Sequence, residues 1–211
     1  MTWFQLAQRF SCSKQRAINL IGANCPRIHD GRLGHEAKTV FSWGGCAFLA
    51  SPAIASNVWQ RHLITMAQPM SAGQIHVDTG SRFLYLTLGG QQALRYGVSV
   101  GAAGRQFTGK AVIARKAVKP SWVPTRNMIR MEPAVYGPFA SGLPGGHPSN
   151  PLGAAALYLH RGGRDTLYRI HGTQQPDRIG QSFSSGCIRL ANADMLDLYA
   201  RVSVGTVVRA A

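Results

Sequence analysis

Short stretches of alternating apolar and polar residues begin near residue 75 of this 211-residue chain. "IHVD" at 75–78 is followed by a Thr-Gly-Ser turn, then by "RFLYLTL", two glycines and "LRYGVSVG". A period of two is typical of strands, and glycine-rich breaks between such runs are typical of tight turns. The pattern therefore predicts a β-meander over residues 75–101.

A second hairpin is predicted over residues 154–172, "AAALYLHRGGRDTLYRIHG", with its turn at the Gly-Gly pair 162–163. Regular pairing of the two strands would set His171 opposite residues 155–156. It would also bring the "NPLG" segment at 150–153 close to His171. The end of this strand is therefore the expected location of a site.

The C-terminal region is expected to contain a helix and a strand. The segment 192–202, "NADMLDLYARV", predicts a helix that is capped by Asn192 and packs through Leu196. "VGTVVRA" at 204–210 predicts the last strand. Residues 103–150 lack a clear period and are expected to be surface loops that shape a site. With 24 glycines and 11 prolines, the chain is expected to be mainly β.

Residues 40–55, "VFSWGGCAFLASPAIA", form an uncharged apolar run that ends in the small-x-small pattern of a secretory cleavage site. The run is short for a transmembrane helix, and the alternative is a buried core segment. We expect an exported protein with an N-terminal extension at 1–55, a linker at 56–74 and a folded domain at 75–211. The extension is either cleaved or retained, and a later start of the chain is a third alternative.

The formal net charge of +15 is spread along the chain and favours anionic partners. No helix–turn–helix, zinc-finger or aromatic ribonucleoprotein pattern accompanies this charge, so no nucleic-acid partner is expected. An anionic cell envelope suits the charge equally well. After cleavage of the extension, no stable membrane insertion is expected.

One cysteine and one histidine near the C-terminal end, Cys187 and His171, are the candidate reactive groups. Of the four cysteines, Cys12, Cys25 and Cys46 precede residue 55, so cleavage there would leave Cys187 without a disulfide partner. A zinc site would need three or four ligands at short spacing, and none is expected. A buried structural pair is the other alternative, but the small residues of "SSGC" would let a substrate approach the cysteine closely.

A cysteine nucleophile needs activation, because a free thiol with a pKa of about 8.5 is mostly protonated at neutral pH. His171 would accept the proton, and the carbonyl of Gly172 would fix its tautomer, since no acidic residue stands beside it in the sequence. The amides of Gly186 and Cys187 are expected to stabilise an oxyanion. Arg189 would either bind a substrate carboxylate or form a structural ion pair.

The motifs "YRIHGT", "IGQSFSSGCIRLANAD" and "VGT" near the C-terminus resemble the L,D-transpeptidase catalytic domain, the YkuD-like family. The resemblance extends upstream through "VDTGSRFLYL", "LRYGVSVG" and "NPLGAAALYL", and covers about residues 75–210. It implies a mixed β-sheet assembly with a capping helix, Cys187 as nucleophile, His171 as base and Gly172 as the orienting carbonyl. The other expected site residues are Ser184, Ser185 and Gly186 in the signature loop, and Arg189, Asn150 and Gly153 at the substrate.

The resemblance also implies a reaction. The cysteine would cleave a peptidoglycan stem peptide before its terminal D-alanine and pass the acyl group to an amine on a second stem or on an envelope protein. The alternatives are an L,D-carboxypeptidase or cysteine amidase that uses water, or a non-catalytic wall-binding module. No cofactor is expected, and the location would be the periplasm or cell envelope. The commoner family pattern has His at the position of Ser185, so this loop lacks a second imidazole.

Overall fold

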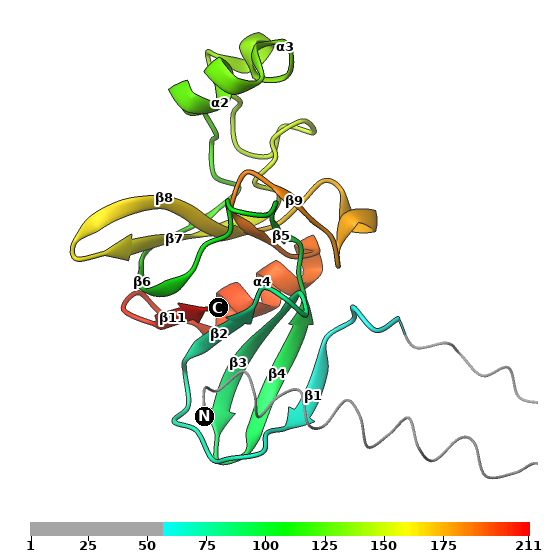
Figure 1. The fold of residues 1–211 in the computed structure, drawn as a ribbon, viewed down its shortest axis with the longest axis vertical. Coiled ribbons are helices and arrows are strands. Elements are labelled where there is room, and N and C mark those ends of the chain that lie inside the picture. Colours follow the sequence, from blue (N-terminus) through cyan, green and yellow to red (C-terminus); the bar gives the residue numbers. More distant parts are fainter. Residues whose placement is uncertain (1–56) are drawn as a thin grey trace, which may run out of the picture.

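A nine-stranded mixed sheet is the main feature of the computed structural model, which describes residues 57–211 (Figure 1). In spatial order its strands are β1 (His62–Thr65), β4 (Gln92–Gly97), β3 (Phe83–Gly89), β2 (Ile75–Asp78), β11 (Val207–Ala210), β6 (Gly109–Val118), β7 (Ala155–Arg161), β8 (Arg164–His171) and β10 (Ile188–Arg189). A second sheet pairs β5 (Val100–Gly101) with β9 (Ser182–Ser184). The β11–β2 and β10–β8 pairs are parallel, whereas the other pairs of the large sheet are antiparallel. The predicted mainly β, mixed-sheet fold is confirmed.

The predicted meander and hairpin are both present. β2, β3 and β4 are antiparallel neighbours, and their inward side chains, such as Leu84 and Tyr96, are fully buried. In the hairpin of β7 and β8, His171 lies opposite Ala156, within the predicted range. The glycine-rich turns that separate the apolar runs identified these strands correctly, although β2 and most of β7 are buried on both faces.

The prediction that residues 103–150 are loops is wrong for their first part. β6 is a ten-residue strand inside the sheet, between β11 and β7. Ala111 and Ile113 are buried, while neighbouring positions of the strand are exposed or half-buried. Its period was hidden because several of its outward positions carry Lys or Arg and its pairing with β7 is irregular between Ile113 and Arg115.

The rest of this stretch forms an excursion above the β7–β8 hairpin (Figure 1). It contains α2 (Arg126–Met131), α3 (Pro133–Tyr136) and the 3₁₀ helix η1 (Gly137–Phe139). None of these three helices has a buried residue. Trp122 packs near the rings of Tyr136 and Phe139, so the excursion is held by a small aromatic cluster of its own.

The predicted linker at 56–74 is largely part of the folded unit. β1 pairs with β4, and the ring of Trp59 lies 5.1 Å from that of Phe83. The sequence hid this strand because it is only four residues long and half of it is exposed. The predicted extension at 1–55, with its apolar export run, lies outside the described residues. No helix in the described part of the chain is long and apolar enough to cross a membrane.

The predicted C-terminal helix is α4 (Asn192–Arg201), which packs on β7 beside the sheet. Met195 and Leu198 are its fully buried residues, whereas Leu196, which was expected to face the core, is 45% exposed. The cap also differs from the prediction, because Ala191 is the N-cap and no side chain caps the helix there. At the other end, the ammonium of Lys116 donates to the carbonyl of Tyr199, 2.7 Å away.

Candidate active site

The parallel pair of β8 and β10 brings His171 and Cys187 together. His171 ends β8 and lies opposite Arg189 of β10, while Ile170 lies opposite Ile188. Cys187 immediately precedes β10, so continuing the same register places it beside Arg169. Because side chains two residues apart on a strand share a face, the thiol and the imidazole project from the same face of two adjacent strands.

His171 is a buried imidazole with a fixed orientation. Its side chain is 2% exposed, and its Nδ1 lies 2.6 Å from the carbonyl oxygen of Gly172. A carbonyl can only accept, so Nδ1 carries the proton and Nε2 is left as the basic nitrogen. Burial, reinforced by the charge of Arg189, lowers the pKa of His171 to about 3, although the Gly172 contact opposes the shift. The imidazole is therefore neutral at neutral pH.

Cys187 is a half-buried free thiol. Burial raises the pKa of the Cys187 thiol, while a backbone hydrogen bond from Arg169 and the charges of Arg189 and Arg169 lower it. Burial outweighs the charges, so the resting pair is a neutral thiol beside a neutral imidazole. This arrangement suits general-base removal of the thiol proton during attack rather than a preformed thiolate–imidazolium pair.

The loop that carries Cys187 is braced by Ser184. The hydroxyl of Ser184 donates to the Cys187 carbonyl at 2.7 Å and accepts the N–H of Gly186 at 3.1 Å. This second bond corrects the expectation that Gly186 serves an oxyanion, because its amide already has a buried partner. The amide of Cys187 is the remaining candidate. Ser185, in contrast, is exposed.

Gly186 is required at its position for a steric reason. Its φ of 135° lies in the region that side chains rarely adopt. A Cβ at this position would come within 2.4 Å of the Tyr168 ring and 2.7 Å of the Arg105 carbonyl. Glycine therefore lets the loop that carries Cys187 pack tightly between β8 and the segment after β5.

Asn150 and Gly153 both make structural contacts, and their expected contact with substrate stays a prediction. Asn150 is 1% exposed, and its amide nitrogen donates to the carbonyls of Pro120 and Pro144. Its side-chain oxygen accepts the N–H of Leu152. Gly153 is buried and lies close to the His171 strand, as predicted. A Cβ there would come within 2.3 Å of the Asn192 side-chain oxygen and 2.6 Å of the Thr173 backbone nitrogen.

Asn192 is a site-supporting residue that the sequence interpretation assigned to a helix cap. Its side-chain oxygen accepts the N–H of Ala154 at 2.9 Å and the N–H of Thr173 at 3.1 Å. It thus ties the start of β7 to the backbone that follows His171. A Cβ on Gly172 would lie 2.2 Å from this oxygen, so Gly172 and Asn192 fit only as a pair. The "HGT…ANAD" spacing gave no signal of this contact.

Arg189 has no carboxylate partner among the described residues. The alternative prediction, that Arg189 forms a structural ion pair, is therefore wrong for residues 57–211. Its guanidinium carbon lies 4.8 Å from the ring centre of Phe183, and its Nε is buried without a hydrogen-bond partner within residues 57–211. Burial lowers its pKa, and Cys187 and then the phenol of Tyr136 on α3 oppose this shift.

No group of three or more His, Cys, Asp or Glu side chains within the described residues could hold a metal ion. The chemistry that the described residues offer at this site is that of a thiol, an oriented neutral imidazole and a nearby unpaired guanidinium. Such a set can transfer an acyl group through a thioester.

Comparison with known proteins agrees with this geometry. The YkuD family profile, the L,D-transpeptidase catalytic domain, matches residues 72–209. The chain is 35% identical over 161 residues to Probable L,D-transpeptidase YbiS of Escherichia coli K12. The aligned stretch covers 75% of this chain and 50% of that protein. It is 33% identical over 173 residues to the ORF 5 product of the ATP synthase subunits region of Fuscovulum blasticum, covering 76% and 82%. The chain thus spans about half the length of the Escherichia coli protein.

Among solved structures, the chain is similar to a Brucella melitensis protein described as a probable carnitine operon oxidoreductase caia. The two are 46% identical with a TM-score of 0.51, and the match covers 72% of this chain and 93% of the other. The likeness supports a shared fold, while the activity in that description belongs to the other protein.

Proposed function

Because the chain belongs to the YkuD family of L,D-transpeptidase catalytic domains, we propose that it is a cysteine-dependent L,D-transpeptidase acting on peptidoglycan stem peptides. The observation that carries the proposal is the contact between His171 and the Gly172 carbonyl beside the Cys187 loop. It supplies an oriented neutral base on the strand next to the thiol. An enzyme of this kind works in the periplasm or cell envelope, where stem peptides are found.

In the first half-reaction, Nε2 of His171 takes the thiol proton while Sγ of Cys187 attacks the carbonyl carbon of the bond that precedes the terminal D-alanine. The amide of Cys187 donates to the oxygen that becomes negatively charged. The tetrahedral intermediate then collapses, the C–N bond breaks and the imidazolium gives its proton to the departing amine. D-Alanine leaves, and the enzyme holds a thioester on Cys187.

In the second half-reaction, an acceptor amine attacks the thioester and His171 takes the amine proton. The C–S bond breaks, and the imidazolium returns its proton to the sulfur. An amine on a second stem gives a cross-link, and an amine on an envelope protein gives an anchored protein. Both halves use the same base and oxyanion donor, so the site needs no rearrangement between them.

Arg189 supports this assignment as the group that binds a carboxylate of the donor stem. A half-buried guanidinium without a carboxylate partner in the described part of the chain is costly unless an anion completes it. A peptide that ends in D-alanine supplies such an anion close to the scissile bond. Binding there would orient the carbonyl carbon toward Cys187.

The test is product analysis by mass spectrometry after incubation of the full-length protein with a disaccharide tetrapeptide. The parent should release D-alanine and form a cross-linked dimer, and the Cys187→Ala variant should do neither while keeping its fold. Tripeptide without dimer would mean that water is the acceptor. Equal D-alanine release by Cys187→Ala would overturn the assignment of the nucleophile.

A further inference from the structure

The strand that carries His171 contains a wide irregularity. At the hairpin turn, Arg161 faces Arg164 and His160 faces Asp165, as in a regular pair. Beyond this point Tyr158 faces Arg169, so two steps along β7 correspond to four steps along β8. β8 therefore holds two extra residues in a bulge, and the bulge decides which residues of β8 stand at the site.

The backbone of the bulge is strained. Leu167 has a φ of 62°, a left-handed conformation that a leucine rarely adopts, and its side chain is 64% exposed. An exposed leucine gains little there from packing, so its neighbours must hold this conformation. Backbone strain that is held in this way is typical of functional sites.

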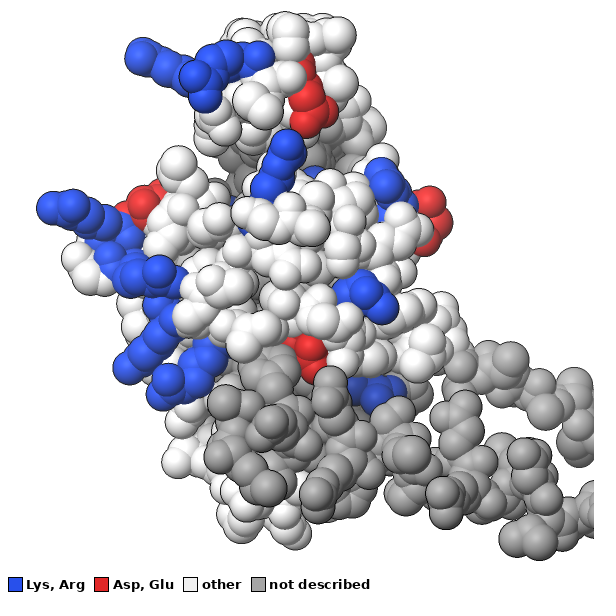
Figure 2. Space-filling model, in the orientation of Figure 1, with Lys and Arg blue, Asp and Glu red and all other residues white. Residues whose placement is uncertain are grey.

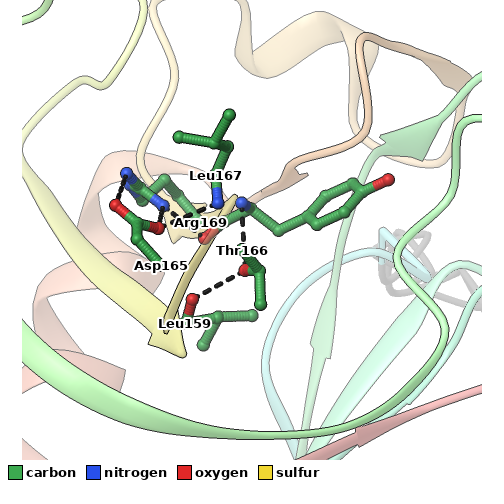
Figure 3. Close-up of polar contacts among 6 residues, drawn as sticks. Leu159, Asp165, Thr166, Leu167 and Arg169 are labelled. Atoms are coloured by element: carbon green, nitrogen blue, oxygen red, sulfur yellow. Dashed lines mark hydrogen bonds and ion pairs between the residues drawn. The ribbon is translucent and has the colours of Figure 1, made fainter. Parts of the chain in front are cut away.

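Side chains of the bulge itself supply the restraint (Figure 3). The hydroxyl of Thr166 donates to the Leu159 carbonyl at 2.6 Å and accepts the N–H of Tyr168 at 3.2 Å. Asp165 accepts the N–H of Leu167 at 2.8 Å. Two short polar side chains thus replace the ladder hydrogen bonds that the extra residues interrupt.

Asp165 also fixes the guanidinium of Arg169. The two form a bidentate pair with N–O distances of 2.7 and 2.8 Å, visible as two dashed lines in Figure 3. The guanidinium donates a further bond to the Tyr168 carbonyl at 2.9 Å and lies 4.4 Å from the ring centre of Tyr158. Only 14% of the Arg169 side chain is exposed.

Arg169 is the residue that the bulge sets beside Cys187. The parallel register, continued by one residue, places it opposite the cysteine and two residues before His171, and its backbone and its charge both lower the pKa of the Cys187 thiol. The charged and titratable groups around the thiol are Arg169, Asp165 and His171 on β8 and Arg189 on β10. Tyr136 of α3 and Arg178 lie beyond, near Arg189.

We propose that the β8 bulge and its Asp165–Arg169 ion pair are a positioning device for the nucleophile, in which Arg169 is held beside Cys187 so that its fixed charge stabilises the thiolate. This inference rests on the proposed role of Cys187 as nucleophile. An arginine remains charged at any pH at which the enzyme works. The device therefore stabilises the thiolate whatever the protonation state of His171.

The test measures the rate at which iodoacetamide alkylates Cys187 in the full-length protein, as a function of pH. Mass spectrometry of the Cys187 peptide monitors the alkylation. Arg169→Met should slow alkylation at pH 7 about three- to tenfold, because loss of a nearby positive charge raises a thiol pKa by roughly half to one unit. The rates should converge at high pH, where every thiol is ionised. Arg169→Lys should restore part of the profile.

Arg201→Met is the matched control, because Arg201 forms the same Asp–Arg pair four residues apart on α4. Its profile should match that of the parent. Thr166→Val changes no charge but removes both hydroxyl bonds of the bulge, and it should also slow alkylation at pH 7. An Arg169→Met or Thr166→Val profile that superimposes on Arg201→Met would overturn the proposal. Alkylation needs no stem peptide, so this result stands apart from a failure of the transpeptidase assay.

Discussion

His171 is kept neutral by its surroundings and oriented by a single contact. Burial and the charge of Arg189 both disfavour the imidazolium, while the Gly172 carbonyl favours it and fixes the tautomer. Cys187 has the opposite balance, because burial disfavours its thiolate and the two nearby arginines favour it. When the proton moves from Cys187 to His171, the two arginines near the sulfur stabilise the thiolate, whereas the surroundings of His171 disfavour the imidazolium.

This balance predicts the acid limb of the pH–rate profile. The pKa of His171 is lowered to about 3, so the base remains unprotonated well below its ordinary value of 6.5. We expect kcat/KM for D-alanine release to stay near its plateau down to about pH 5 and to fall only at lower pH. A loss of activity centred near pH 6.5 in steady-state assays would contradict the neutral-base account.

Ser185 gives a second prediction at this scale. It is exposed, and the braces of the loop run through Ser184 and Gly186 instead. Ser185→His should therefore change the free energy of unfolding by no more than about 0.5 kcal/mol. Urea denaturation measures this directly. A loss several times larger would show that the loop depends on the serine.

At the level of elements, the site is the junction of four segments. β8 carries His171 and the loop before β10 carries Cys187, while the start of β7 and the N-terminal turn of α4 hold the backbone that follows His171. Asn192 makes the contact between α4, Ala154 and Thr173. The helix therefore contributes to the site through a side chain at its first turn.

Asn192→Ala should leave two backbone N–H groups without their acceptor. We expect a loss of about 1–3 kcal/mol in the free energy of unfolding. Since Gly172 would also lose its support, kcat should fall more than KM rises. Asn127→Ala on α2 is the matched control, because Asn127 is exposed and accepts one bond from Arg130. An Asn192→Ala enzyme as stable and active as this control would contradict the account.

The elements that the sequence predicted correctly are those with a strong local signal. The meander, the hairpin and α4 have clear periods or turns, and the Gly172 carbonyl was the acceptor nearest to His171 in the sequence. β6 was missed because basic residues interrupt its apolar period and its pairing is irregular, and the bulge was missed because it depends on side-chain bonds across two strands. Asn192 was misassigned because a polar residue before a helix usually caps it. Long-range contacts of this kind leave no local pattern.

At the scale of the whole molecule, the sheet buries two neutral histidines far apart in its strand order, His76 in β2 and His171 in β8. Burial and the charge of Arg209 lower the pKa of His76 to about 4. The exterior, in contrast, is strongly basic, and Lys and Arg side chains outnumber acidic ones on the face seen in Figure 2. The fold is therefore expected to be sensitive to acid through its interior and to attract anionic polymers through its exterior.

The two histidines predict how stability depends on pH. Below pH 6.5 the unfolded chain protonates them, whereas the folded chain does not until about pH 4 for His76 and about pH 3 for His171. The unfolded state thus binds more protons in this window, and the free energy of unfolding should fall as the pH falls. From pH 7 to pH 5 we expect each histidine to contribute a loss of roughly 2 kcal/mol.

Urea titrations at several pH values test this prediction. His171→Gln should remove about half of the loss between pH 7 and pH 5, because His76 remains. A parent protein equally stable at both pH values would show that the buried histidines do not govern acid stability.

The central claim is that Cys187 forms an acyl-enzyme with a stem peptide. The most direct measurement is the mass of the Cys187 peptide after brief incubation of the full-length protein with a disaccharide tetrapeptide and acid quenching. The account predicts an adduct equal to the donor stem without D-alanine, carried on Cys187 and on none of the other three cysteines. D-Alanine release without any such adduct, or an adduct that persists in Cys187→Ala, would contradict it.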